Sequence, residues 1–166
     1  MSITAVRGAD VETIRQVHGD FVHGGTFSHH AVGAATGLAV LRYLQKNNLV
    51  TASAAKGKVL GEKLSAALGE LPCVGDVRGI GLLWGVEFVA DRATKAPFPP
   101  AAHFARRVAD AAFDKGLIVY PVAGCADGVA GDLVLVAPPF IITEAQMDEI
   151  VRLLREAVLE VSGSST

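Results

Sequence analysis

Along most of the chain, apolar residues recur every three or four positions, which is the period of a helix with one buried face. The last such stretch follows Thr143 and Gln146, whose spacing is that of a capping box at a helix start. Asp10 is the expected cap of the first stretch. Helices are therefore predicted over Val11–Val17, Ala31–Lys46, Thr51–Leu68, Pro100–Lys115 and Glu144–Val161.

Short apolar runs, bounded by glycine, proline and polar residues, lie between these helices and are typical of buried strands. They predict strands over Leu82–Val89, Leu117–Tyr120 and Leu133–Val136. The order of elements predicts an α/β fold (an α+β small domain) in which helices cover a small sheet. We expect these strands to share one sheet, with the helices Pro100–Lys115 and Glu144–Val161 packed on it.

A Gly-x-Gly pair occurs at Arg78–Gly81, just before the first predicted strand. A dinucleotide-binding fingerprint would need a third glycine and a following helix, and the chain has neither at this point. The pattern therefore predicts a tight turn between paired strand segments.

Composition excludes several classes of protein. Hydrophobic residues make up 51% of the chain and charged residues 19%, so disorder is not expected. The 15 basic and 17 acidic residues form no basic stripe, which argues against a nucleic-acid partner. No apolar run is long enough to cross a membrane, and the start of the chain resembles no secretory signal. Cys73 and Cys125 are expected to be free thiols in the cytoplasm.

The segment Phe21–His30 is apolar and rich in glycine and histidine, and it leads directly into the helix that begins at Ala31. His23, His29 and His30 lie close together, but no further ligand follows at zinc-like spacing. No metal site is predicted. The histidines are expected to cap and pack a loop instead.

Thr26 follows two glycines just before this helix, and that arrangement suggests a phosphate site. Backbone amides and the helix dipole both favour an anion at such a position. The alternative is structural: the hydroxyl of Thr26 or Ser28 caps the helix. The sequence pattern alone leaves both interpretations open.

No constellation for acid–base or nucleophilic catalysis is evident. The candidate carboxylates Asp76, Glu87, Asp127 and Asp132 have no partner carboxylate or histidine at short spacing. Ser28 lacks the flanking glycines of a nucleophile elbow. No catalytic residue is therefore predicted in this chain.

Three blocks, in order, resemble the class III aminotransferases, the omega-transaminase type among fold-type-I pyridoxal-phosphate (PLP) enzymes. His23–Ala31 is similar to the family's His-Gly-x-Thr-aromatic-x-x-His-Pro, with alanine in place of the proline. Val77–Glu87 resembles Val-Arg-Gly-x-Gly-Leu-x-x-Gly-Val-Glu. Ala137–Thr143 resembles Pro-Pro-Leu-x-Ile-Thr. The resemblance extends over residues 10–161.

The resemblance implies an arrangement of domains. Residues 1–46 would be the end of the large cofactor domain and the connecting helix, 47–161 the small C-terminal domain, and 162–166 a frayed tail. It also implies a homodimer, or an assembly with an N-terminal part that lies outside this sequence. The substrates would be an amine or amino acid and an oxo acid.

The resemblance further implies that Thr26 contacts the phosphate of PLP held by the neighbouring subunit, with Gly25 and Phe27 beside it. Arg78 and the Pro-Pro segment are expected to be architectural. Many relatives carry an arginine for the substrate carboxylate in the loop that corresponds to Gly124–Asp132, and this loop has none. Carboxylate recognition by that route is not expected here.

The Schiff-base lysine of such enzymes lies upstream of the first block, and no lysine here has the family's sequence context. We expect the chain to be a fragment of the enzyme and inactive by itself. Its lysines are expected to be solvated surface residues: Lys46, Lys56, Lys58, Lys63, Lys95 and Lys115.

Two other functions are compatible with the sequence. The chain could be a non-catalytic interaction or assembly domain derived from such an enzyme, because a small domain without its partner exposes apolar surface. It could also bind a phosphate ligand unrelated to PLP. An aminotransferase fragment remains the favoured interpretation.

Overall fold

The computed structural model of the chain describes residues 6–26 and 28–163. Contacts divide the chain into two compact units, Met1–Asn48 and Leu49–Thr166. Within the described residues, no helix is both long and apolar enough to cross a membrane.

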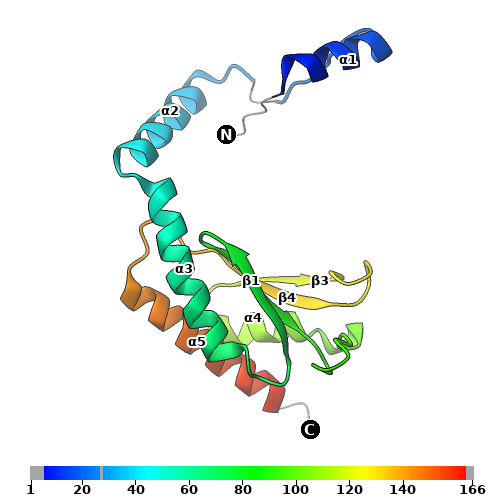
Figure 1. Ribbon diagram of the computed structural model, residues 1–166, viewed down its shortest axis with the longest axis vertical. Coiled ribbons are helices and arrows are strands. Elements are labelled where there is room, and N and C mark those ends of the chain that lie inside the picture. The colour runs from blue at the N-terminus through cyan, green and yellow to red at the C-terminus, as the bar shows by residue number, and fades with distance from the viewer. Residues whose placement is uncertain (1–5, 27, 164–166) are drawn as a thin grey trace. The chain divides into compact units, whose positions relative to one another are not determined.

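Two helices form the first unit: α1 (Gly8–His18) and α2 (Ala31–Lys46) (Figure 1). The bounds of α2 are those predicted. The predicted cap of α1 is wrong, because Arg7 occupies the N-cap position and Asp10 lies in the first turn. Their side chains still meet there, with Arg7 Nε 2.8 Å from a carboxylate oxygen of Asp10.

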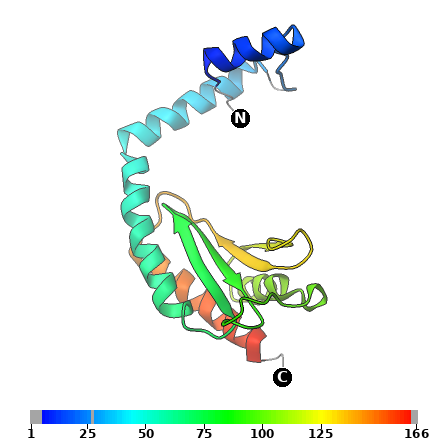
Figure 2. The ribbon, with the colours of Figure 1, turned by 45° about the vertical axis from the view of Figure 1, so that its right-hand side comes forward.

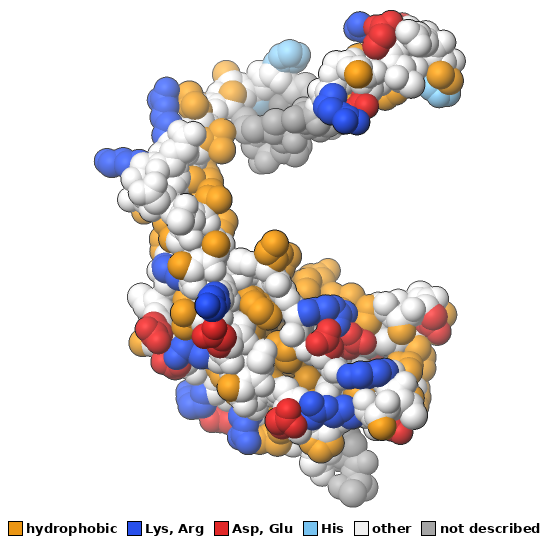
Figure 3. Space-filling view, in the orientation of Figure 1, with side chains coloured by type: hydrophobic (Ala, Val, Ile, Leu, Met, Phe, Trp, Pro, Cys, Tyr) orange, Lys and Arg blue, Asp and Glu red, His pale blue; other side chains and the backbone are white. Residues whose placement is uncertain are grey.

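Neither helix of this unit buries a residue, although α2 carries few polar side chains. A helix that is apolar on all sides is typical of a protein interior. Hydrophobic side chains reach the surface in both units (Figure 3). On α2 the exposed large hydrophobic residues are Val32, Leu38, Val40, Leu41 and Tyr43.

The second unit is built on one four-stranded sheet with the strand order β1-β2-β4-β3. The strands are β1 (Val74–Ile80), β2 (Leu83–Phe88), β3 (Tyr120–Ala123) and β4 (Asp132–Val136), and all neighbours are antiparallel (Figures 1 and 2). The prediction that the strands share one small sheet is confirmed.

The turn predicted at Arg78–Gly81 connects β1 to β2. Ile80 pairs with Leu83, and Gly81 has φ +53°, in the left-handed region that glycine adopts without strain. The indole Nε1 of Trp84 donates a hydrogen bond to the Gly81 carbonyl at 2.8 Å, which closes the hairpin from one side.

The third strand lies further along the chain than predicted, at Tyr120–Ala123 instead of Leu117–Tyr120. Leu117 and Val119 are buried, so the apolar run packs into the core, but it is not part of the β3 ladder. Tyr120 already pairs with Leu135, and β4 ends one residue later, before two prolines. Proline has no N–H to extend the ladder.

Three long helices accompany the sheet: α3 (Leu49–Leu68), α4 (Phe104–Asp114) and α5 (Glu144–Gly163) (Figure 2). The helix predicted over Pro100–Lys115 is broken. A short 3-10 turn, Pro100–Ala102, comes first, and a left-handed residue (φ 45°) separates it from α4.

One cluster of buried side chains joins the three helices to one face of the sheet, so the predicted packing of α4 and α5 is confirmed. Along β4, fully buried residues alternate with half-buried ones, which marks its inner and outer faces. The cluster includes Leu60, Leu64, Val86, Phe88, Phe104, Val108, Val134, Met147, Leu154 and Val158.

Helix α3 lies very close to the β1–β2 hairpin through two glycines. A Cβ at Gly57 would lie 2.0 Å from the Gly81 carbonyl oxygen, and one at Gly61 would lie 2.1 Å from the Trp84 ring. Only glycine permits this approach.

Candidate functional site

The segment between α1 and α2 contains a closed turn that presents Thr26. The Ser28 N–H donates to the Gly25 carbonyl at 2.9 Å, and the Gly25 N–H donates to the Ser28 hydroxyl at 3.0 Å. Thr26 lies inside this turn and is exposed. The third residue of the predicted site, Phe27, lies outside the described residues.

Helix α2 is capped by His30 and not by either of the two hydroxyls. The Gly33 N–H donates to His30 Nδ1 at 2.9 Å, and the Ala34 N–H donates to the His30 carbonyl at 2.9 Å. The alternative that Thr26 or Ser28 caps this helix is therefore wrong. The histidines were expected to cap and pack a loop, and the structure shows that His30 caps helix α2.

The Thr26 hydroxyl forms no hydrogen bond with any described residue, so its donor and acceptor are available to another molecule. The fold of this unit does not require glycine at the two positions before Thr26. A Cβ at Gly24 or Gly25 would meet nothing within 4 Å, and neither residue has a left-handed φ. Glycine at these positions leaves room for a group that approaches from outside the unit.

The loop does not form a complete ring of free amides around an anion. The N–H of Gly25 is bound to Ser28, and the N–H of Gly33 is bound to His30. The residues present therefore fit a phosphate through the Thr26 hydroxyl and the open space beside Gly24 and Gly25. They fit the periphery of a cofactor and not a full binding pocket.

Two of the lysines are not the solvated residues that the sequence suggested. The side chains of Lys63 and Lys115 are each 27% exposed, and both form ion pairs with α5. Hydrogen bonds to Asp148 and to Glu160, respectively, raise the pKa of these two ammonium groups. A lysine activated for attack on a carbonyl needs the opposite shift.

The candidate carboxylates all have structural partners. Asp76 and Glu87 face each other on β1 and β2, and Arg78 forms ion pairs with both, which fits an architectural role for that arginine. Asp127 accepts the N–H groups of Ala130 and Val129 in the loop before β4, and these bonds lower the pKa of its carboxyl.

Asp132 was missed as a structural residue. It is 4% exposed, and its carboxylate accepts the Ala105 N–H at 2.9 Å, in the first turn of α4. His103 holds the N-cap position of α4 but makes no side-chain cap. The sequence signal for this role was a single acidic residue at the start of an otherwise apolar strand. Its partner could not be found from the sequence because it lies 27 residues away.

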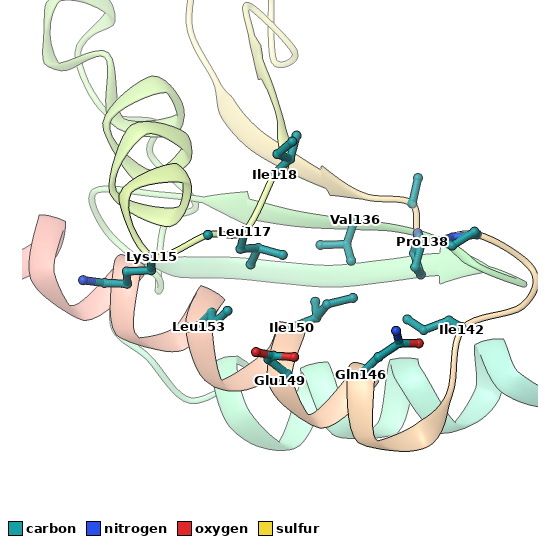
Figure 4. A pocket seen from close by; sticks show the side chains of 13 residues that line it. Lys115, Leu117, Ile118, Val136, Pro138, Ile142, Gln146, Glu149, Ile150 and Leu153 are labelled. Carbon is teal, nitrogen blue, oxygen red and sulfur yellow. The ribbon is translucent and has the colours of Figure 1, made fainter.

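A groove of about 620 Å³ lies between α5, the end of β4 and the segment 115–118 (Figure 4). Gln146, Glu149, Ile150 and Leu153 line it from α5. Its lining includes no histidine, cysteine, serine or threonine, and apolar side chains dominate. Lys115 and Glu149 supply the charged side chains of its lining. Among the described residues, no three His, Cys, Asp or Glu side chains come together at a distance suited to a metal.

Comparisons with known proteins agree with this arrangement of helices, sheet and loop. The family model described as "Aminotransferase class-III" matches residues 1–158. An uncharacterized aminotransferase, YodT, of Bacillus subtilis (strain 168) is 40% identical over 161 residues, which are 97% of this chain and 36% of that protein.

Solved structures give the same result. A transaminase from the marine bacterium Virgibacillus superposes with a TM-score of 0.79 at 32% identity, over 93% of this chain and 34% of that one. A PLP-bound aminotransferase mutant from Vibrio fluvialis superposes with a TM-score of 0.73 at 33% identity, over 93% of this chain and 32% of that one.

The chain belongs to the class III aminotransferase family. Its fold is that of the corresponding part of fold-type-I transaminase structures. It spans about a third of the length of the curated relatives that it matches.

Proposed function

We propose that this chain serves as the C-terminal third of a PLP-dependent transaminase, which moves an amino group between an amine or amino acid and an oxo acid. The observation that carries the proposal is the family match over residues 1–158, together with relatives about three times as long. In this assignment residues 1–46 end the large domain and 47–161 form the small domain.

Within such an enzyme, the chain's contribution to the cofactor is the loop before α2. Thr26 donates its free hydroxyl to the phosphate of PLP, and Gly25 lets that phosphate approach the backbone. Phe27 is the third residue of this contact. PLP, when bound, supplies an electron sink for the carbon that gains or loses the amino group.

The lysine that binds the cofactor covalently belongs to a part of the enzyme outside this sequence. The described residues support this assignment, because none of their lysines is buried. Hydrogen bonds to carboxylates of α5 also raise the pKa of Lys63 and Lys115, which is opposite to the shift that attack on a carbonyl needs. Acid–base chemistry at the substrate also comes from elsewhere, since the candidate carboxylates already stabilise turns, an ion-pair cluster and a helix start.

The proposed partner is either a second copy or the N-terminal part of the enzyme, and exposed apolar surface supports such an assembly. No residue of α2 is buried within the described part of its unit. On the sheet, Ile80 is 83% exposed and Tyr120 is 68% exposed. Surface of this kind is typical of a chain that functions inside a larger assembly.

The proposal is tested with a chimera in which this chain replaces the matching C-terminal region of the Bacillus subtilis relative. The chimera is expected to bind PLP and to transfer amino groups, because the exchanged part is 40% identical over 161 residues. The relative itself is the positive control. A chimera that folds, by circular dichroism and size, yet retains no PLP would refute the proposal.

A second candidate function is a non-catalytic assembly domain, which the same exposed apolar residues favour. It predicts that the isolated chain forms a defined oligomer whose mass does not change when PLP is added. Sedimentation velocity of the isolated chain, with and without PLP, measures this. A monomer at all concentrations would exclude the assembly domain.

A further inference from the structure

The N-cap group of helix α2 is an imidazole, which accepts a hydrogen bond only through a ring nitrogen that carries no hydrogen. Ser, Thr, Asp and Asn are the usual capping residues, and they accept a hydrogen bond over the physiological pH range. His30 accepts the Gly33 N–H through Nδ1 at 2.9 Å. The ring can do this only when Nδ1 carries no hydrogen, which requires the neutral tautomer protonated at Nε2.

Protonation of His30 removes this cap and adds a charge in an unfavourable place. Nδ1 then becomes a donor that faces the Gly33 N–H, and the cation lies at the positive end of the helix dipole. The first turn of α2 contains no acidic residue, and no residue of the helix is buried. The nearest titratable groups along the chain are His29 and His23.

The cap is connected to the turn that presents Thr26 through one residue, His29. Its φ is 62°, in the left-handed region that side chains other than glycine seldom adopt. This backbone is fixed on one side by the Gly25–Ser28 hydrogen bonds and on the other by the His30 cap. Without the cap, His29 can relax, and the direction in which Thr26 leaves α2 changes with it.

We propose that His30 is a pH-sensitive positioning residue: neutral His30 caps α2 and orients the turn that carries Thr26, and protonated His30 releases both. The capping part depends only on this chain. The consequence for phosphate binding rests on the proposed function of Thr26.

Nuclear magnetic resonance of the full 166-residue chain tests the cap. The Gly33 amide is expected to lose hydrogen-exchange protection as the His30 ring protonates, by roughly tenfold, which is the size of a lost N-cap. In His30→Asn the side-chain oxygen replaces Nδ1, so protection should persist in acid. In His30→Ala it should be absent at every pH. The inference is overturned if the protection of the Gly33 amide does not change when His30 is protonated. It is also overturned if Nδ1 of His30 carries a hydrogen at neutral pH.

The positioning role is tested in the chimera with the Bacillus subtilis relative, with PLP as the probe. PLP affinity should fall about tenfold in His30→Ala and be restored in His30→Asn, if a cap of that size orients Thr26. The affinity of His30→Asn should also be less sensitive to acid than that of the parent. If Thr26→Ala weakens PLP binding but His30→Ala does not, the positioning role is wrong and the proposed function stands. If Thr26→Ala has no effect, the proposed function fails, and the exchange of Gly33 still decides the cap.

Discussion

Replacing Gly57 with alanine tests the close approach of α3 to the β1–β2 hairpin. In an exposed helix this change is stabilising by about 1 kcal/mol, because alanine has the higher helix propensity. Here the new Cβ would lie 2.0 Å from the Gly81 oxygen, 2.3 Å from its carbonyl carbon and 2.6 Å from its Cα. These are backbone atoms, so the clash cannot be relieved by a side-chain rotation.

Overpacking costs about 1–3 kcal/mol, and a contact of 2.0 Å with backbone atoms places Gly57→Ala in the upper part of that range, above the gain of about 1 kcal/mol in helix propensity. Gly57→Ala should therefore lower the free energy of unfolding by about 1–2 kcal/mol, and the melting temperature by about 4–8 °C for a unit of this size. Because Trp84 donates to the carbonyl that is displaced, its fluorescence should also change. It is the only tryptophan in the chain.

The matched control is Ala66→Gly on the exposed side of the same helix. This change should cost about 1 kcal/mol through helix propensity alone and leave the emission of Trp84 unchanged. A higher melting temperature for Gly57→Ala, with unchanged emission, would show that α3 does not approach the hairpin in this way.

Further predictions concern the buried aspartate, the lysines and the thiols. Asp132→Ala should lower the free energy of unfolding by about 1–3 kcal/mol, since it leaves the buried Ala105 amide unpaired, and Asp132→Asn should cost less; urea denaturation measures both. Incubation with PLP, borohydride reduction and peptide mapping should reveal no lysine labelled stoichiometrically, because no lysine among the described residues is buried in the apolar setting that activates the amine; full labelling of one lysine would contradict this. Burial raises the pKa of both thiols, so alkylation should be slow at pH 7 and faster as the pH rises, with exposed Cys125 ahead of buried Cys73.

Much of the fold could be predicted because the local signals agree with the tertiary packing. The bounds of α2 match the periodicity, and the capping box of α5 forms as expected, with hydrogen bonds between Thr143 and Gln146 at 3.0 and 3.3 Å. The Gly-x-Gly pair was correctly assigned to a turn, because Gly81 adopts a positive φ there that favours glycine.

What could not be predicted depends on contacts between distant residues or on less common local chemistry. His103 has a left-handed backbone and breaks the helix before α4. The first turn of α4 is capped instead by the carboxylate of Asp132 on β4. Asp76 and Glu87 are eleven positions apart, and only the register of β1 and β2 brings both to Arg78. In the candidate site, Thr26 was identified by family resemblance. Imidazole is not among the usual capping groups, so the particular role of His30 was not evident.

In the proposed function, Thr26 binds the phosphate of PLP in a transaminase completed by another part of the enzyme. The most direct test is the PLP dissociation constant of the chimera with Thr26→Ala, with Thr26→Ser as the control that keeps the hydroxyl. A hydrogen bond to an ionised phosphate contributes about 1.5–3 kcal/mol, so the alanine variant should bind PLP about ten- to a hundred-fold more weakly. Its melting temperature without PLP should be unchanged, because His30 and not Thr26 caps α2. Equal PLP affinity in the parent and both variants would contradict the claim.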